Sequence, residues 1–228
     1  DWLPKNERTI EKIIIEKTSK LLNSNIIVAK QSSNKTFKLI EKTIKDNKSN
    51  KLFFSENYNY SVSENGFFYY EDMIGRIKLP KPNVNGQFQL ENISTAIATL
   101  RVVNEININN KHIKNGITKI KSIARLQEIT KGKLKDLVEE NILLVDGSHN
   151  PLGAKVLNDY LEGLNCDKHI ILGMMANKDH QEYMSYFKDI TTLTTIDIPN
   201  QPNSIGGKDL KNKLINFENV QYKKNIFE

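Results

Sequence analysis

The stretch LLVDGSHNPLGAKVL, residues 143–157, decides how the second half of this chain is expected to fold. An apolar run ends at Asp146, Gly147 supplies a tight turn, and an amphipathic helix follows. Asn150 suits the N-cap position and Pro151 the first helical position, where a missing backbone donor costs nothing. The stretch therefore predicts a strand, a turn and a helix, with Asp146 at the carboxyl end of the strand.

Strands and helices alternate beyond this stretch. Alternating elements of such lengths indicate a parallel sheet with right-handed crossovers, which is a Rossmann-like arrangement. Open sheets of this kind bind ligands at the carboxyl ends of their strands. We therefore expect a ligand site at Asp146 and His149, because capping the helix needs neither of them. The predicted strands are 142–146, 169–173 and 192–198, and the predicted helices are 152–164 and 180–187.

The first half of the chain has a different pattern, and we place a domain boundary at Ser122. Short β-like runs between Asn, Ser and Glu turns predict a small antiparallel addition within residues 51–79. Apolar residues at helical spacing predict helices on both sides of it. The predicted helices are 10–21, 36–47, 92–104 and 112–120, and the predicted strands are 26–30, 52–54, 66–70 and 75–79.

The composition is that of a globular protein. The chain has 228 residues, 38% hydrophobic and 26% charged, which is enough to bury a core. No run reaches the roughly 18 consecutive apolar residues of a membrane span, so no membrane partner is expected. The single cysteine, Cys166, cannot form an internal disulfide, which agrees with a reducing compartment. We therefore expect a cytoplasmic protein.

The formal net charge of +6 raises the possibility of nucleic-acid binding. The excess is mostly lysine scattered among Asn and Ile along the whole chain. The basic stretches 131–135 and 223–224 are short, and aromatic residues are not interleaved with them as stacking platforms would require. We therefore expect no nucleic-acid partner.

Four phrases together resemble a known family. VDGSHNP (145–151) resembles the D-x-A-H-N-P signature of the carboxyl-terminal domain of the Mur ligase superfamily, particularly of folylpolyglutamate and dihydrofolate synthases. IARLQ (123–127) resembles P-G-R-L-E/Q, with Ala124 in place of Gly. GQFQLENISTAIATL (86–100) resembles G-x-H-Q-x-x-N-A-x-x-A-x-x-x-L, with Phe88 in place of His, and LGMMANKD (172–179) resembles G-x-x-x-D/N-K-D. The resemblance implies an α/β fold, with a Rossmann-like Mur ligase domain at 123–228 preceded by the remaining part of the central ATPase domain at 1–122.

The resemblance also implies a reaction. ATP would phosphorylate the carboxylate of dihydropteroate or of a folate glutamyl tail, and the amino group of L-glutamate would then displace the phosphate. By this similarity Asn92 contacts the base side of the nucleotide, Arg125 the phosphates and Asp146 the ribose, while His149 is catalytic near the transferring phosphate. Arginine offers a planar fork of donors to phosphate oxygens, and a carboxylate accepts hydroxyls well. ATP is then expected between the two domains.

Lys17 is a candidate for a second catalytic and metal-binding role. The run DWL followed by IIIEKTSKLL (13–22) resembles the family's D-W-L and I-x-x-E-K-A-G-I, whose lysine is carbamylated and helps hold Mg²⁺. A carbamate would give Lys17 the anionic oxygen that Mg²⁺ prefers. Thr18, Ser19 and Lys20 replace A-G-I, and an ordinary surface lysine is the alternative, with Lys12 equally available.

Part of the family's machinery has no counterpart in the sequence. No GxxxxGK[ST] phosphate loop occurs, and the chain stops at Glu228, before the family's closing strand. We therefore expect a fragment that is inactive as it stands, and a monomer. Two alternatives stay open: another Mur-type amide ligase, such as a peptidoglycan precursor enzyme, and a nucleotide-binding module without catalysis.

Overall fold

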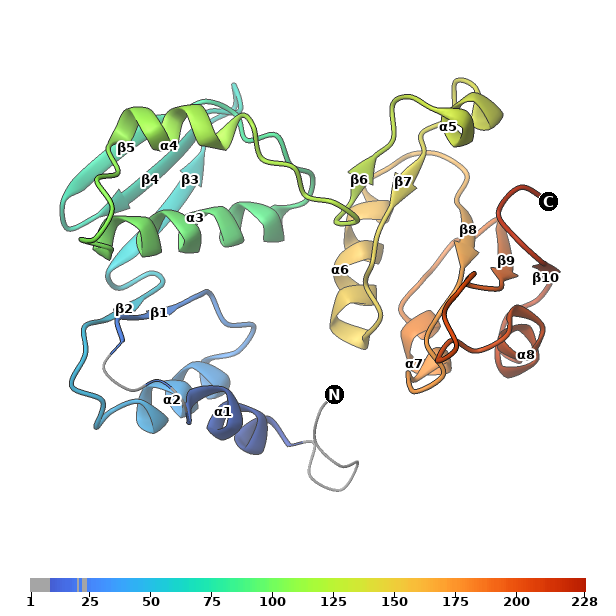
Figure 1. Cartoon of the computed structure of the whole chain (residues 1–228), viewed down its shortest axis with the longest axis horizontal. Coiled ribbons are helices and arrows are strands. Elements are labelled where there is room, and N and C mark those ends of the chain that lie inside the picture. Colours follow the sequence, from blue (N-terminus) through green and yellow to red (C-terminus); the bar gives the residue numbers. More distant parts are fainter. Residues whose placement is uncertain (1–8, 20, 22–23) are drawn as a thin grey trace. The chain divides into compact units, whose positions relative to one another are not determined.

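The computed structural model describes residues 9–19, 21 and 24–228, and the chain divides into two compact units (Figure 1). The division falls between Lys121 and Ser122. We call the residues before it the first unit and those after it the second unit. Both contain helices and strands, so the α/β class predicted from the sequence is confirmed.

Two helices and two short parallel strands begin the first unit. β1 (Ile26–Val28) pairs with β2 (Lys51–Phe53) in parallel. α1 (Ile10–Thr18) contacts α2 (Asn34–Thr43), which starts after Ser33 because the Ser33 hydroxyl accepts a hydrogen bond of 3.1 Å from the Thr36 N–H. These elements share a small core, made of Ile26, Val28, Ile44 and Phe53 with Leu21, Phe37 and Ile40 packed against it.

A three-stranded antiparallel sheet forms the rest of the first unit. Its strands are β3 (Tyr58–Val62), β4 (Phe68–Asp72) and β5 (Gly75–Leu79), in that order. Alternate residues point to one face, which α3 (Gln87–Val102) and α4 (Asn110–Ile117) cover. The core between them contains Tyr58, Phe68, Tyr70, Ile77, Leu79, Ile93, Ile97, Ala98, Ile113 and Ile117.

The structure corrects three predictions in this unit. Residues 52–54 were expected in the antiparallel addition, but β2 pairs in parallel with β1. β3 was missed because Asn and Ser alternate with its tyrosines and resemble turn residues. α3 begins five residues before the predicted start, at a Gly86 N-cap whose φ of 83° suits glycine, and Ala98 is buried on it where Ala96 was expected.

The second unit is built on a three-stranded parallel sheet. Its order is β10 (Val220–Lys223), β9 (Thr192–Ile196) and β8 (His169–Leu172). The helices are α6 (Pro151–Glu162), α7 (His180–Ser185) and α8 (Gly207–Lys213). The core lies among these elements, and its buried residues are Ala154, Leu172, Met174, Tyr183, Met184, Phe187, Leu193, Ile205, Leu210, Leu214 and Val220.

The strand that precedes Asp146 departs from the prediction. β7 has only two residues, Leu144–Val145, and it pairs antiparallel with β6 (Gln127–Glu128), not with the parallel sheet. Ile142 is 60% exposed, so the apolar run is not the doubly covered strand that its composition suggested. The short α5 (Lys133–Val138), α8 and β10 were also not predicted.

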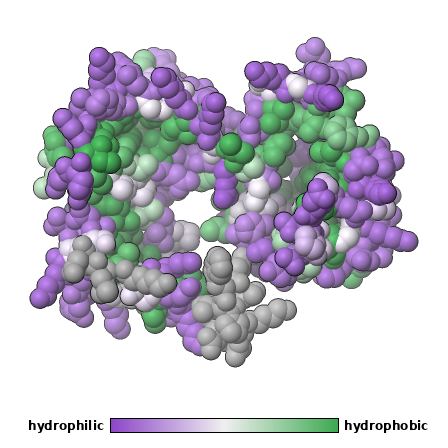
Figure 2. Space-filling model, in the orientation of Figure 1, coloured by the Kyte–Doolittle hydropathy of each residue, from purple (hydrophilic) through white to green (hydrophobic). Residues whose placement is uncertain are grey.

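Hydrophilic side chains cover much of the face of each unit that Figure 2 shows. Among residues 9–19, 21 and 24–228, no helix is both long enough and apolar enough to cross a membrane.

Candidate functional site

The Asp146 side chain joins two turns of the second unit. Its Oδ1 accepts a hydrogen bond of 2.7 Å from the Ser148 N–H, and its Oδ2 accepts one of 2.8 Å from the Leu126 N–H. The Gly147 N–H donates to the Ala124 carbonyl at 2.8 Å, so the two turns are also joined through their backbones. Each carboxylate oxygen has two lone pairs, so the half-buried side chain keeps acceptor sites for a ligand.

Arg125 lies between two residues with left-handed backbone. Ala124 has a φ of 50° and Leu126 a φ of 47°, values that non-glycine residues seldom adopt. The Leu126 side chain is 1% exposed, whereas Arg125 is exposed. The local backbone therefore buries Leu126 and directs Arg125 to the surface. It also gives a reason for the glycine of the related phrase P-G-R-L-E/Q at the position of Ala124.

His149 follows the Asp146 turn and is exposed. Its Nδ1 lies 3.0 Å from the Gly147 carbonyl oxygen. Because a carbonyl can only accept, Nδ1 carries the proton in this bond, and Nε2 of the neutral ring is left as an acceptor. This fixes the tautomer in which Nε2 can take up a proton.

The start of α6 is adjacent in sequence to His149. Asn150 is its N-cap, with the side-chain oxygen accepting from the Gly153 N–H at 2.8 Å, and Pro151 is its first residue, both as predicted. The positive end of the helix dipole therefore lies beside His149, which favours an anionic ligand there.

Tyr183 also contacts this turn, and it was not identified from the sequence. Its hydroxyl lies 2.9 Å from the Ser148 hydroxyl, and its side chain is 4% exposed. Burial raises the pKa of the Tyr183 phenol, an effect that the Ser148 hydrogen bond partly offsets. The available signal was Ser148 itself, because the related signature D-x-A-H-N-P has Ala at that position.

The other two predicted residues belong to the first unit. Asn92 is exposed on α3, and its side-chain nitrogen donates to the Gln89 Oε1 at 3.3 Å. Lys17 is exposed in the last turn of α1. The phrase DWL and Lys20, which supported the Lys17 prediction, lie outside the described residues. The structure thus brings Arg125, Asp146 and His149 together within one unit.

The described residues offer little to a metal ion. In that part of the chain, no three or more His, Cys, Asp and Glu side chains gather into a potential metal site. A carbamate on Lys17 would be one oxygen ligand of the several that Mg²⁺ needs. A magnesium site is therefore not formed by the acidic and histidine side chains that the structure describes.

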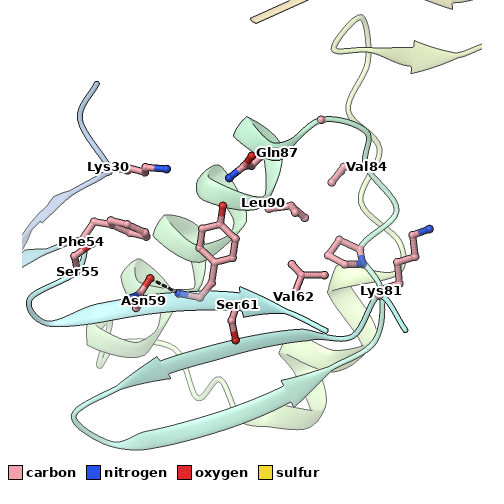
Figure 3. A pocket seen from close by; sticks show the side chains of 14 residues that line it. Lys30, Phe54, Ser55, Asn59, Ser61, Val62, Lys81, Val84, Gln87 and Leu90 are labelled. Atoms are coloured by element: carbon pink, nitrogen blue, oxygen red, sulfur yellow. Dashed lines mark hydrogen bonds between the residues drawn. The ribbon is translucent and has the colours of Figure 1, made fainter. Parts of the chain in front are cut away.

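The first unit also contains a pocket of about 780 Å³ beside β3 and the first turn of α3, and none of the five predicted site residues lines it. Figure 3 shows Lys30 and Lys81 at its opposite ends, with Val62 and Leu90 between them. Lys30 forms an ion pair of 2.7 Å with Glu91 at this place, and that hydrogen bond raises the Lys30 pKa. The pocket was missed because β3 was missed.

Parallel and antiparallel sheets combine here into a mixed α/β fold, which solved folylpolyglutamate synthase structures share. No protein-family model matches the chain. The folylpolyglutamate synthase of Lacticaseibacillus casei is 27% identical over 143 residues, which cover 60% of this chain and 32% of that protein. The resemblance to folylpolyglutamate synthases stated above is confirmed.

Solved structures of these synthases share the fold. The Mycobacterium tuberculosis folylpolyglutamate synthase, complexed with ADP and AMPPCP, has a TM-score of 0.80 at 14% identity and covers 99% of this chain. Escherichia coli FolC, in complex with DHPP and ADP, has a TM-score of 0.76 at 22% identity and covers 100%. The matches take up 51% and 50% of those proteins, so this chain spans about half of their length.

Proposed function

We propose that this chain is part of an ATP-dependent ligase that adds L-glutamate to dihydropteroate, to folate polyglutamates or to both. The observation that carries the proposal is the position of Arg125, exposed between two left-handed residues and joined through the backbone to the Asp146 turn. An exposed arginine on a turn that is hydrogen-bonded to the turn of Asp146 and His149, which precedes a helix N-terminus, suits a nucleoside polyphosphate. Related synthases of the same fold were solved with ADP, AMPPCP and DHPP.

Each residue has a role that matches its chemistry. Asn92 contacts the base side of the nucleotide, Arg125 neutralises the phosphates, and Asp146 accepts hydrogen bonds from the ribose hydroxyls. A carboxylate oxygen of the folate substrate attacks the γ-phosphorus of ATP, and ADP leaves. The amino nitrogen of glutamate then attacks the acyl carbon, and inorganic phosphate leaves.

His149 acts near the transferring phosphate. Since its Nδ1 proton is directed to the Gly147 carbonyl, Nε2 is the nitrogen that can accept the proton lost by the attacking amine. If Mg²⁺ binds with ATP, it would neutralise charge on the phosphates, and a carbamate on Lys17 would be one of its oxygen ligands.

The complete gene product provides the test. We expect phosphate release that needs ATP, glutamate and either dihydropteroate or a folate, with no turnover of a UDP-linked muramyl peptide. Arg125→Ala lowers kcat/KM by about 100-fold or more, the typical effect of removing a charge-stabilising donor. Lys211→Gln, at an exposed cation on α8, serves as the matched control and leaves kcat/KM unchanged.

Two other outcomes would contradict the proposal. Turnover of the muramyl peptide alone would assign the protein to another Mur-type amide ligase. Nucleotide binding without turnover of any of these substrates would assign it to a nucleotide-binding module without catalysis.

A further inference from the structure

The Arg125 guanidinium depends on its own backbone for its position. In the described part of the chain, its side chain is exposed and makes no hydrogen bond or ion pair with another described residue. A long side chain without partners samples many rotamers, so the backbone at its base limits where it can reach. That backbone has left-handed φ values on both sides, at Ala124 and Leu126.

Left-handed backbone at two non-glycine residues persists only where the surroundings hold it. Four contacts do so: the buried Leu126 side chain, the bond from the Ala124 N–H to the Gln127 Oε1 at 3.0 Å, the bond from the Gly147 N–H to the Ala124 carbonyl at 2.8 Å, and the bond from the Leu126 N–H to Asp146 at 2.8 Å. The last two reach the turn that carries His149, and of these two only the Asp146 bond is made by a side chain. Asp146 therefore links the geometry of Arg125 to that of the His149 turn.

Resting on the proposed function, we propose that Asp146 is a positioning residue for Arg125, in addition to its contact with the nucleotide. The carboxylate accepts one backbone N–H from each turn, and this pair of bonds, here called the Asp146 clamp, sets the place from which Arg125 meets phosphate. A carboxylate is needed because it accepts at both oxygens, whereas an amide of the same shape has one oxygen and one donor group. In Asp146→Asn one of the two backbone N–H groups would face that donor group.

The experiment separates the clamp from the ribose contact by using a ligand without ribose. Tripolyphosphate binding to the 228-residue chain is followed by amide NMR shifts for the wild type, Arg125→Met, Asp146→Asn and the control Lys211→Gln. We expect Arg125→Met and Asp146→Asn to weaken tripolyphosphate binding by similar factors, at least about fivefold, while Lys211→Gln stays within twofold. In Asp146→Asn the Leu126 amide also exchanges with solvent at least about tenfold faster.

The other possible results distinguish a failure of the Asp146 clamp from a failure of the phosphate role of Arg125. If Arg125→Met weakens tripolyphosphate binding and Asp146→Asn does not, the clamp is overturned and the phosphate role of Arg125 stands. If Arg125→Met has no effect on tripolyphosphate or ATP, the proposed phosphate role fails. Should Asp146→Asn not fold, hydrogen exchange of the wild type decides the matter, because a Leu126 amide that exchanges at the unprotected rate contradicts the clamp.

Discussion

Gly153, in the first turn of α6, lies so close to Ser148 that a Cβ atom added to it would stand 2.7 Å from the Ser148 Cβ. Neither residue can move freely, since Ser148 donates its N–H to Asp146 and Gly153 donates its own to the Asn150 side chain. The absence of a side chain at Gly153 therefore lets the turn containing His149 fold back on the helix.

Gly153→Ala is expected to destabilise the chain by about 1–3 kcal/mol, the usual cost of forcing extra atoms into a packed place. The matched control is Gly116→Ala in α4, where an added Cβ meets nothing within 4 Å. That substitution should stabilise by about 0.5–1 kcal/mol, because alanine is the better helix former. Urea denaturation measures the free energy of unfolding of both variants. Equal stabilisation by the two substitutions would show that the contact of the added Cβ with Ser148 costs nothing.

Ala124→Gly is expected to stabilise the second unit. A left-handed conformation costs a non-glycine residue about 1–2 kcal/mol, and the extra unfolded-state entropy of glycine offsets about 0.5–1 kcal/mol of the gain. The control Ala96→Gly lies on an exposed helical position of α3 and should destabilise by about 1 kcal/mol. The two free energies of unfolding should thus change in opposite directions, and a loss of stability at both positions would argue against the φ of 50° at Ala124.

Arg101→Met is expected to cost about 3–5 kcal/mol, the range for leaving one partner of a buried ion pair alone. The Arg101 guanidinium bonds both oxygens of Asp72, at 2.7 and 3.1 Å, and the two side chains are only 11% and 8% exposed. The comparison is Lys188→Met, which breaks a 3.8 Å pair with Glu162 at 73% and 45% exposure and should cost less than about 1 kcal/mol. Similar losses of unfolding free energy in both variants would contradict the description of Arg101 and Asp72 as a buried ion pair.

His180 should make the stability of the second unit sensitive to acid. Burial lowers the pKa of its imidazole, which is 4% exposed and donates from Nε2 to the Met175 carbonyl at 3.0 Å. Below about pH 6.5 the unfolded chain therefore binds a proton that the folded chain resists, and stability falls by at most about 1.4 kcal/mol per pH unit.

His180→Gln removes this titration. The difference in unfolding free energy between wild type and variant, measured from pH 7.5 down to 5.5, should shift steadily against the wild type. If the unfolding free energies of wild type and variant changed with pH by the same amount, the His180 pKa would not be lowered on folding.

The sequence predicted correctly those features that depend only on neighbouring residues, such as the start of a helix. Asn150 and Pro151 marked the start of α6 correctly, because capping depends only on neighbouring residues. The partner of β7 could not be predicted in this way, because pairing with β6 depends on a connection of 15 residues between Glu128 and Leu144. A two-residue strand also gives no alternation to recognise.

The sequence suggested residues for the candidate site but not how they are arranged. Arg125, Asp146 and His149 were identified by resemblance, yet the bond from the Leu126 N–H to Asp146 joins residues 20 positions apart. Tyr183 lies 35 residues from Ser148 and resembles any core aromatic in the sequence. The Leu126 contact depends on the pairing of β6 with β7, and the Tyr183 contact on the packing of α7 against α6. No short phrase of the sequence encodes either.

The proposed function requires that Asn92, Arg125 and Asp146 contact one adenine nucleotide. Amide NMR of the isotopically labelled chain, titrated with ATP at constant salt, tests it most directly. We expect the signals of all three residues to shift along one saturation curve, with one dissociation constant. Signals that stay in place at all three residues, or that saturate separately at Asn92 and at the Arg125 and Asp146 pair, would contradict it.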